Sequence, residues 1–474
     1  MNNISKLDSR FDEAKKKYGE EVALALYDHI DMIGKEFYLW LTGLFVPRDC
    51  KCENFDKDGN RVCLLPKNKD GICKCSGGGF YYSNSARDSD EYKIDIESTV
   101  QALHFLMTSG LTRNYKGGIK EALPKQMQLD VCAFAKSLQS DADGYFYHPQ
   151  WGEAITPSRK GRDLRWSTSI LENFGDMPLY DTKNGHKGSL GAPRGLSEAD
   201  EVKKNDEKKT NSTWIPELQT IEAFRDFLNS LDLKNNSYSS FNTINAIVEQ
   251  IPARDQKALE DGENLEVGFI KTLEASFNSR QNEENGLWED EVAYISSNGL
   301  MKLVTSYNVL GLKLQNAVSA FKSAMKIALI SPDDCDAHGM RAYAAVDVFN
   351  PWVSMRSIRY NAEKFGDKEE LEAIDSLLRE NLVALIRNTT AKAKKFKKPD
   401  GSFGYSWKYS PYKSQGAPVA VPETIEGDVN GGTIAVGGIL GHMCVALGLE
   451  KIPIYSQDDL EEYLKIVKKK GGYR

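Results

Sequence analysis

The sequence contains no apolar run close to the ~20 residues that a membrane-spanning helix requires. It also has no excess of basic residues, because its 474 residues carry a formal net charge of −7. The N-terminal segment is polar and lacks the apolar core of a signal peptide. We therefore expect no membrane partner, no nucleic-acid partner and a cytoplasmic location, or a secreted protein if a leader was removed. An acidic chain can still bind an anionic substrate, since a cleft can be locally basic.

Two common ligand-binding signatures are missing as well. The glycine-rich segment 77–87 lacks the Gly-Lys-Ser/Thr ending of a phosphate-binding loop and follows no clear strand. The acidic run at 333–336 does not have the spacing of a diphosphate–metal site, which disfavours a terpenoid cyclase. We interpret 77–87 as an irregular surface that offers polar side chains, including Asn84, to a polar ligand.

Strand-like alternation is scarce, and helical spacing dominates the chain. Apolar residues recur three or four positions apart, as in amphipathic helices. About a dozen helices joined by turns predict an all-α fold, and an α/α toroid of six to seven helical hairpins fits the pattern better than an α/β fold. The clearest helical segments are 215–233, 243–255, 265–280, 313–330, 342–366 and 368–396.

One tight turn occurs three times between helical segments. Its copies are Asp143-Gly144, Asn285-Gly286 and Asp400-Gly401, each followed within two residues by an aromatic side chain. Asp-Gly and Asn-Gly suit such turns because both residues tolerate a positive φ. The recurrence predicts an array of helical hairpins whose connecting turns share one rim.

We expect one catalytic domain over residues 1–474, with a cysteine-rich loop at 46–76 and a polar insertion at 181–213. The insertion is rich in Lys, Glu, Asn and Gly and almost devoid of large apolar residues. Such a segment cannot bury enough surface to offset the entropy of ordering. We interpret it as a mobile lid or a disordered insertion, in which His186 has no apparent partner.

Five of the eight cysteines lie in the 46–76 loop, as a Cys-x-Cys pair, the lone Cys63 and a second Cys-x-Cys pair. Clustered thiolates can hold zinc, whose structural sites take four nitrogen or sulfur ligands in a tetrahedron. Disulfides or reduced surface thiols are the alternatives, and a cytosolic chain disfavours disulfides. We expect one structural zinc bound by Cys50, Cys52, Cys73 and Cys75.

Polar and aromatic residues gather around the three turns, and packing alone seldom collects them around loops. Simpler interpretations stay open, because Asp428 or Asn430 can cap the helix that follows and Glu426 can be solvated. His104 and His442 lie in apolar helical runs, so we interpret both as core residues. The three groups are Trp288, Tyr294, Asn298 and Tyr307; His148, Trp151, Arg162 and Arg165; and Trp407, Glu426 and Asp428.

The repeated turns, the segments 147–151 and 162–166, and Asn298-Gly299-Leu300-Met301-Lys302 with Tyr307 resemble the α/α-toroid polysaccharide lyases. The resemblance is strongest to the uronic-acid-specific branch, which includes glucuronan, alginate and heparinoid lyases. It extends over most of the chain from about Gly77 onward. The same toroid also serves six-hairpin glycosidases and terpenoid cyclases, so the fold alone does not decide the reaction.

The resemblance implies β-elimination on an anionic carbohydrate, with no cofactor needed for the chemistry. Tyr307 would be the acid/base, His148 the base or its orienting partner, and Asn298 with Arg165 the groups that neutralise the uronate carboxylate. A tyrosine can be a base only if cations lower its pKa from ~10, a role expected of the arginines. The remaining substrate contacts would come from Trp151, Trp288, Trp407, Tyr294, Arg162, Asn84, Glu426 and Asp428.

Two alternatives to a lyase stay open. An inverting glycoside hydrolase would use Glu426 or Asp428 with a second carboxylate such as Glu289 or Asp290, ~6.5–9.5 Å away. A non-catalytic carbohydrate-binding toroid would keep the tryptophans without bringing tyrosine, histidine and arginine to one point. Tyr82, Tyr147 and Tyr294 also compete with Tyr307 for the role of base.

Overall fold

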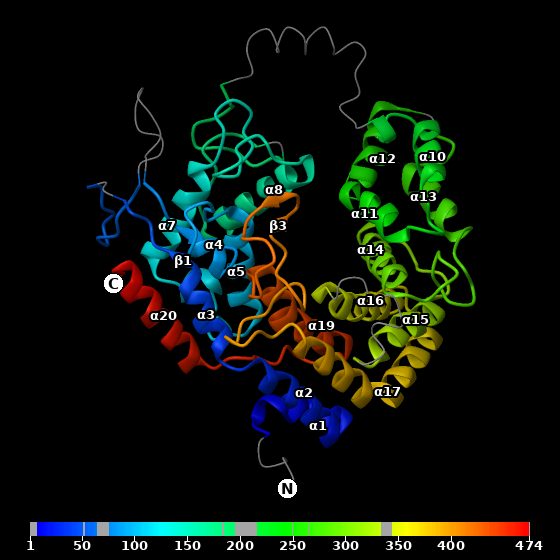
Figure 1. The fold of residues 1–474 in the computed structure, drawn as a ribbon. Helices are drawn as coiled ribbons and strands as arrows, with labels where there is room; N and C mark the ends of the chain where they lie inside the picture. Colours follow the sequence, from blue (N-terminus) through cyan, green and yellow to red (C-terminus); the bar gives the residue numbers. More distant parts are fainter. Residues whose placement is uncertain are drawn as a thin grey trace. The chain divides into compact units, whose positions relative to one another are not determined.

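The computed structural model describes residues 7–50, 53–63, 75–182, 184–194, 216–248, 250–263, 265–332 and 344–473. Within these ranges the chain is mostly helical, and its strands form two antiparallel pairs of two residues each. The predicted all-α class is therefore confirmed. The contacts divide the chain into two compact units, each made of three segments (Figure 1). A closed toroid and a single domain stay predictions.

Unit 1 comprises Met1–Met32, Lys209–Lys395 and Ile439–Ile452. It contains two short 3₁₀ helices, η2 (Ser9–Phe11) and η3 (Pro216–Leu218). Its described α-helices are α1 (Asp12–Tyr18), α2 (Glu20–Ile33), α10 (Ile221–Ser230), α11 (Ser237–Ile247), α12 (Gln250–Asp261), α13 (Phe269–Asn278), α14 (Tyr294–Leu310), α15 (Ala317–Leu329), α16 (Ala345–Lys364), α17 (Lys368–Lys394) and α19 (Ile439–Ala446).

Helical hairpins build much of unit 1. α14 contacts both α11 and α16, α16 also contacts α19, and α15 and α17 pack on each other and on α16 (Figure 1). Short links, 311–316 and 365–367, make α14 with α15 and α16 with α17 consecutive helix pairs. The close approach of α11 to α14 requires Gly299, because a Cβ there would lie 2.1 Å from Ser237 Oγ.

Unit 2 comprises Ile33–Lys208, Phe396–Gly438 and Pro453–Arg474. Helix α5 lies near its centre and contacts α8, α18 and η5. The described elements are α3 (Glu36–Leu44), β1 (Phe45–Val46), β2 (Gly79–Phe80), α4 (Asn84–Arg87), α5 (Ile96–Thr108), α6 (Ile119–Ala122), α7 (Lys125–Ser137), α8 (Pro157–Phe174), β3 (Lys413–Ser414), β4 (Ala417–Pro418), α18 (Val429–Gly432), the π-helical η5 (Thr433–Gly438) and α20 (Gln457–Gly471).

The three predicted turns have one local structure. Gly144, Gly286 and Gly401 have φ values of +76°, +68° and +83°. The side-chain oxygen of the preceding Asp or Asn accepts a hydrogen bond from the backbone N–H two residues later, at 2.8–3.1 Å in the three copies. A Cβ on any of these glycines would lie within 2.3 Å of another segment. The positive-φ turns are confirmed, whereas their common rim stays a prediction.

The start of the polar segment 181–213 is folded. Lys187 and the Gly188 N–H both bind the Asp181 carboxylate at 2.8 Å. His186 Nε2 lies 2.7 Å from Glu172 Oε1 on α8, so the expectation that His186 has no partner is wrong. Polar contacts replace the apolar anchors that the segment lacks. Within this segment, Lys183 and residues 195–213 fall outside the described part of the chain.

One helical stretch among the described residues, Val429–Ala446, is long and apolar enough to cross a membrane by length and composition alone. The structure buries 61% of this stretch. Because a buried core helix passes the same test, the finding is weak evidence for a membrane span.

Candidate functional site

Helix α8 carries a fully buried arginine in unit 2. The helix begins after Thr156, whose hydroxyl accepts a hydrogen bond from the Arg159 N–H at 3.1 Å. The Arg159 guanidinium contacts three buried carboxylates, with nitrogen–oxygen distances of 2.8 Å to Asp95, 2.8 Å to Asp163 and 3.2 Å to Glu97. These contacts join the starts of α5 and α8. Sequence reasoning missed this network, although Arg159 and Asp163 have the four-residue spacing of a helical ion pair.

Arg159 contacts three carboxylates, and the pKa values of two of them, Asp163 and Asp95, shift in opposite directions. Burial raises the pKa of Asp163 to about 7, although Arg159 opposes the shift. Burial acts to raise the pKa of Asp95, but the charge of Arg159, the charge of His148 and the hydrogen bonds from Ser98 together outweigh it, so the net shift is downward. Since Arg159 and its three partners are each at most 1% exposed, the network holds the fold together and offers no surface to a substrate.

The following turns of the two helices carry a second group of residues, which we call the α5–α8 surface: Gln101, His104, Arg162, Arg165 and Trp166. The Arg162 side chain is 35% exposed and pairs with Glu97 at 3.2 Å. Its guanidinium carbon lies 4.5 Å from the centroid of the Trp166 ring, a cation–π contact. Gln101 donates a hydrogen bond to Asn430 Oδ1 at 3.2 Å, which ties α5 to α18. Gln101 is buried, so the surface presents the two arginines and the Trp166 ring to solvent.

His104 is an ionisable side chain on the α5–α8 surface whose charge state suits proton abstraction. Burial, and then the charge of Arg165, lower the pKa of His104 below its ordinary value of 6.5. The imidazole is therefore neutral at pH 7 and can accept a proton. The ring is partly exposed, so the interpretation of His104 as a core residue is wrong.

His148 is a poor candidate for the base. Its ring is 3% exposed, and Nδ1 accepts hydrogen bonds from the Gln150 and Trp151 N–H groups at 3.2 and 3.4 Å. Burial lowers the pKa of His148 to about 4, so the ring is neutral and carries its proton on Nε2. A nitrogen that already bears a proton cannot abstract one. Trp151 is half-buried, and its indole N–H donates to the Pro418 carbonyl oxygen at 2.8 Å.

The carboxylates of the hydrolase alternative serve as helix caps. Asp428 is fully buried, caps α18 through the Gly431 N–H at 2.7 Å, and also accepts from the Tyr405 N–H at 2.7 Å. Glu426 is 5% exposed and accepts from Ser83 Oγ at 2.7 Å and the Ser85 N–H at 2.8 Å. The capping interpretation of Asp428 is confirmed, and the expectation of a solvated Glu426 is wrong.

Two other predicted contact residues of unit 2, Asn84 and Trp407, bind residues outside the α5–α8 surface. Asn84 donates to Asp400 Oδ2 at 3.3 Å. Trp407 is partly exposed, and its carbonyl oxygen accepts from Lys398 Nζ at 2.9 Å.

The predicted catalytic residues of unit 1 are buried. Tyr307 is 0% exposed, its hydroxyl donates to Asn278 Oδ1 at 3.0 Å, and burial raises its pKa well above 10. Asn298 donates to Asp347 Oδ1 at 3.1 Å and accepts from Asn350 at 2.8 Å. Assigning Tyr307 as the base is wrong for this structure, because its phenol is protonated and reaches no solvent. The amide of Asn298 is likewise committed to neighbours on α16.

Trp288 and Tyr294 also belong to the core, at 3% and 2% exposure, so neither can stack on or bind a sugar here. The Trp288 indole N–H donates to the Phe277 carbonyl oxygen at 2.9 Å. The hydrolase partner Glu289 caps α11 by accepting from the Ser237 N–H at 2.9 Å. The burial of Trp288 could have been predicted, because the repeated turns align it with Phe146 and Phe403, and apolar rings at one repeat position usually pack.

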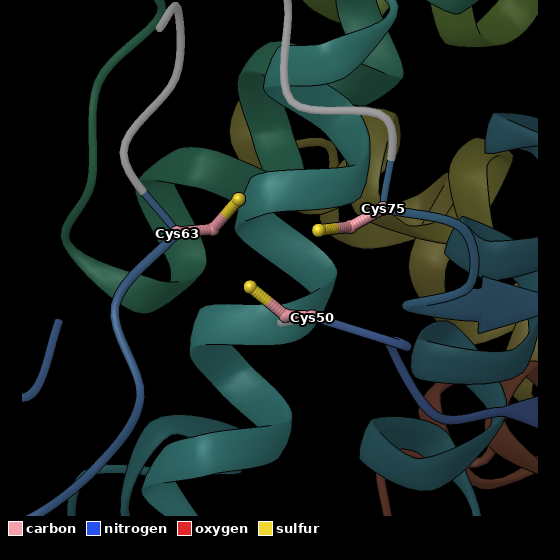
Figure 2. Close-up of side chains that lie close together, drawn as sticks. All are labelled: Cys50, Cys63 and Cys75. Carbon is pink, nitrogen blue, oxygen red and sulfur yellow. The ribbon is translucent and has the colours of Figure 1, made fainter. Parts of the chain in front are cut away.

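The cysteine-rich loop brings three thiols together (Figure 2). The pairing of β1 with β2 continues through the Asp49 N–H, which donates to the Ser76 carbonyl oxygen at 2.8 Å and places Cys50 beside Cys75. A tight turn between Phe55 and Arg61 then returns the chain to Cys63. The three sulfur atoms all lie within 4.8 Å of one another.

This thiol cluster differs in part from the predicted ligand set. Cys50 and Cys75 were expected, Cys63 was not, and Cys52 and Cys73 lie outside the described residues. Thiolates bound to a tetrahedral zinc at ~2.3 Å are about 3.8 Å apart, so small side-chain movements suffice to bind an ion. The guanidinium of Arg48 lies 4.0 Å from Cys63 Sγ. The cluster can therefore hold a metal ion.

Comparison with known proteins gives no assignment: no family model matches the chain, and no curated protein or solved structure is detectably similar to it.

Proposed function

We propose that the chain is an α/α-toroid polysaccharide lyase that cleaves uronic-acid-containing polysaccharides at the α5–α8 surface. One observation carries the proposal: His104 on α5 is partly exposed and lies near Arg165 on α8, whose charge, after burial, lowers the pKa of His104. Arg162, stacked on Trp166, supplies a second cation and an aromatic face. A base, a carboxylate-binding cation and a sugar-stacking ring are the parts that β-elimination on a uronate needs.

In this proposal Arg165 binds the uronate carboxylate and stabilises the enolate that forms as the C5 proton leaves. His104 accepts that proton, the C5 electron pair forms the C4–C5 double bond, and the C4–oxygen bond breaks. The leaving oxygen takes a proton from the imidazolium or from water. No water is consumed and no cofactor is required, so the product carries a double bond conjugated with its carboxylate.

The test is an assay on glucuronan, alginate and heparinoid substrates that follows ultraviolet absorbance and new reducing ends together. A lyase produces both signals, and His104→Gln should lower the rate by about 10²–10⁴-fold, the contribution of a general base. His186→Gln is the matched control, because this histidine contacts Glu172 outside the α5–α8 surface. Reducing ends without absorbance would indicate a hydrolase, and normal activity of His104→Gln would remove His104 from the mechanism.

A titration of the His104 ring by NMR tests the charge state without a substrate. The midpoint should lie below pH 6.5 in the wild type, because burial and Arg165 disfavour the imidazolium. Arg165→Gln should move the midpoint to higher pH. A midpoint that does not respond to this change would contradict the coupling between the two residues.

We further propose that Cys50, Cys63 and Cys75 bind one structural zinc, with a fourth ligand from Cys52, Cys73 or water. The observation in its favour is the convergence of three thiols from separate parts of the 46–76 loop. Protein purified without chelator should contain about one zinc per chain, and Cys63→Ser should lower that content. Cys132→Ser, which changes a buried thiol on α7, should leave it unchanged. Protein free of metal, with all thiols titratable, would exclude the site.

A further inference from the structure

Unit 1 contains a cavity of about 460 Å³ among helices α14, α16 and α19. This volume lies in the ~300–1,000 Å³ range of small-molecule sites. Val309, Tyr360 and Val445 give the cavity an apolar wall. These three side chains are 56%, 53% and 37% exposed, so a bound molecule would cover apolar surface that now faces solvent.

One arginine on the cavity wall, Arg356, has no counter-charge among the described residues. Arg356 on α16 is half-buried, and burial lowers its pKa. Within the described residues no carboxylate pairs with it and no hydrogen bond reaches its guanidinium. The neighbouring Arg359 differs, because its guanidinium contacts Asp375 at 3.1 Å and Glu363 at 3.7 Å. A desolvated cation without a partner is unfavourable unless something else supplies the negative charge.

Glu363 is the one carboxylate among the described lining residues of the cavity, and it lies 3.7 Å from Arg359, with no ion pair to Arg356. On α19, one turn before Val445, His442 has a buried Nδ1 with no hydrogen bond among the described residues. Burial and the charge of Arg356 lower the pKa of His442 to about 3, so the ring is neutral. Asn308 is fixed by hydrogen bonds to Ser357 and Asn361 at 3.0 and 2.8 Å and forms a rigid polar wall.

We propose that this cavity binds a small organic anion, with its carboxylate or phosphate group on Arg356 and its apolar body against Val309, Tyr360 and Val445. A guanidinium binds either oxyanion through two parallel hydrogen bonds. The apolar wall selects anions that carry a hydrocarbon or aromatic body over inorganic ions. This site lies within unit 1 and is independent of the α5–α8 surface and of the function proposed for it.

Calorimetric titration of the full-length protein with three probes tests the site. Benzoate and phenyl phosphate carry the two oxyanions on one aromatic body, and benzyl alcohol is their neutral counterpart. At least one anion should bind saturably, at least about tenfold more tightly than the alcohol. The tighter anion identifies the preferred head group. Equal affinity for the alcohol, or no saturable binding of either anion up to ~10 mM, overturns the proposal.

Arg356→Gln should weaken binding of the preferred anion by at least about tenfold. Arg387→Gln, which removes the same charge from an exposed position on α17, should not change it. The melting temperature of Arg356→Gln separates a binding role from a structural one. We expect it to equal or exceed that of the wild type, because the variant loses a half-buried charge that has no counter-charge among the described residues. Unchanged anion affinity in this variant assigns Arg356 to the fold alone.

Discussion

Arg159 illustrates how much a single buried charge can hold in place. Its guanidinium is the shared partner of Asp95, Glu97 and Asp163. Arg159→Met should lower the free energy of unfolding by about 3–5 kcal/mol, because it leaves buried carboxylates without their cation. Urea denaturation measures the loss.

The control is Arg165→Met, which removes the same charge from an exposed position on the same helix. Its free energy of unfolding should stay within about 0.5 kcal/mol of the wild type. Equal losses in the two variants would contradict the assignment of Arg159 as the centre of the network.

Asp347 predicts a dependence of stability on pH. Burial raises the pKa of Asp347 from 3.8 to about 6 in the folded state, so folding favours the protonated carboxyl. This group stabilises the fold fully below pH 3.8, and the contribution falls as the pH rises to about 6. The loss is at most about 3 kcal/mol, at ~1.4 kcal/mol per unit.

Asp347→Asn isolates this contribution, because its amide has no proton to lose in this range. The variant should gain stability relative to the wild type as the pH rises from 4 to 6, and the difference should then stay constant. Urea unfolding of both proteins at a series of pH values measures it. A difference that is constant from pH 4 to 7 would show that the carboxyl does not titrate as described.

Side-chain burial was the least predictable property of individual residues. The sequence placed Tyr307 near a helix rich in polar side chains, yet its hydroxyl contacts Asn278 and lies inside unit 1. His104 shows the opposite error: the apolar run around it indicated a core residue, whereas the side chain is partly exposed. Both outcomes depend on which neighbour covers a helix face. That information comes from segments far away in the sequence, as for Arg159 and Asp95, which are 64 positions apart.

Helices and turns were better predicted, because their signals are local. Apolar spacing identified the helical class, and the Asp/Asn-Gly pairs identified three turns whose glycines all have positive φ. The same repeat indicates that Trp288 is a core residue, since Phe146 and Phe403 occupy the equivalent position and are fully buried. A repeated turn thus predicts core residues as well as loop geometry.

Gly286→Ala should strongly destabilise unit 1. The residue has φ of +68°, and a Cβ would lie 2.2 Å from the Ala320 nitrogen, so the change adds a steric overlap to the backbone strain. We expect the free energy of unfolding, measured by urea denaturation, to fall by about 3 kcal/mol or more. Gly262→Ala is a close control, because Gly262 has φ of +69° with nothing within 4 Å of a Cβ. The free energy of unfolding of that control should fall by only about 1–2 kcal/mol, the cost of the backbone strain without a steric overlap.

The two units of the whole molecule are interleaved along the chain, and this limits how it can be divided. Unit 1 needs residues 1–32 and 439–452 in addition to 209–395. Lys17 and Tyr18 donate hydrogen bonds to the Leu447 carbonyl oxygen at 2.9 and 2.7 Å, and α19 packs on α16.

A fragment of residues 209–395 should therefore not unfold cooperatively, because it exposes the face of α16 on which α19 packs and loses the contact of Thr390 on α17 with His29 on α2. Near-ultraviolet circular dichroism during urea denaturation measures this. A sharp transition with a native-like aromatic signal would show that these helices form an independent domain.

Interleaving also sets the order of events during synthesis. The segment 439–452 follows Met32 by more than 400 residues, so the ribosome needs roughly 20–80 s to produce it at ~5–20 residues per second. Helices α1 and α2 emerge first but wait that long for part of their own unit. Lys17 and Tyr18, which bind the Leu447 carbonyl oxygen in the finished protein, lack that partner throughout the interval.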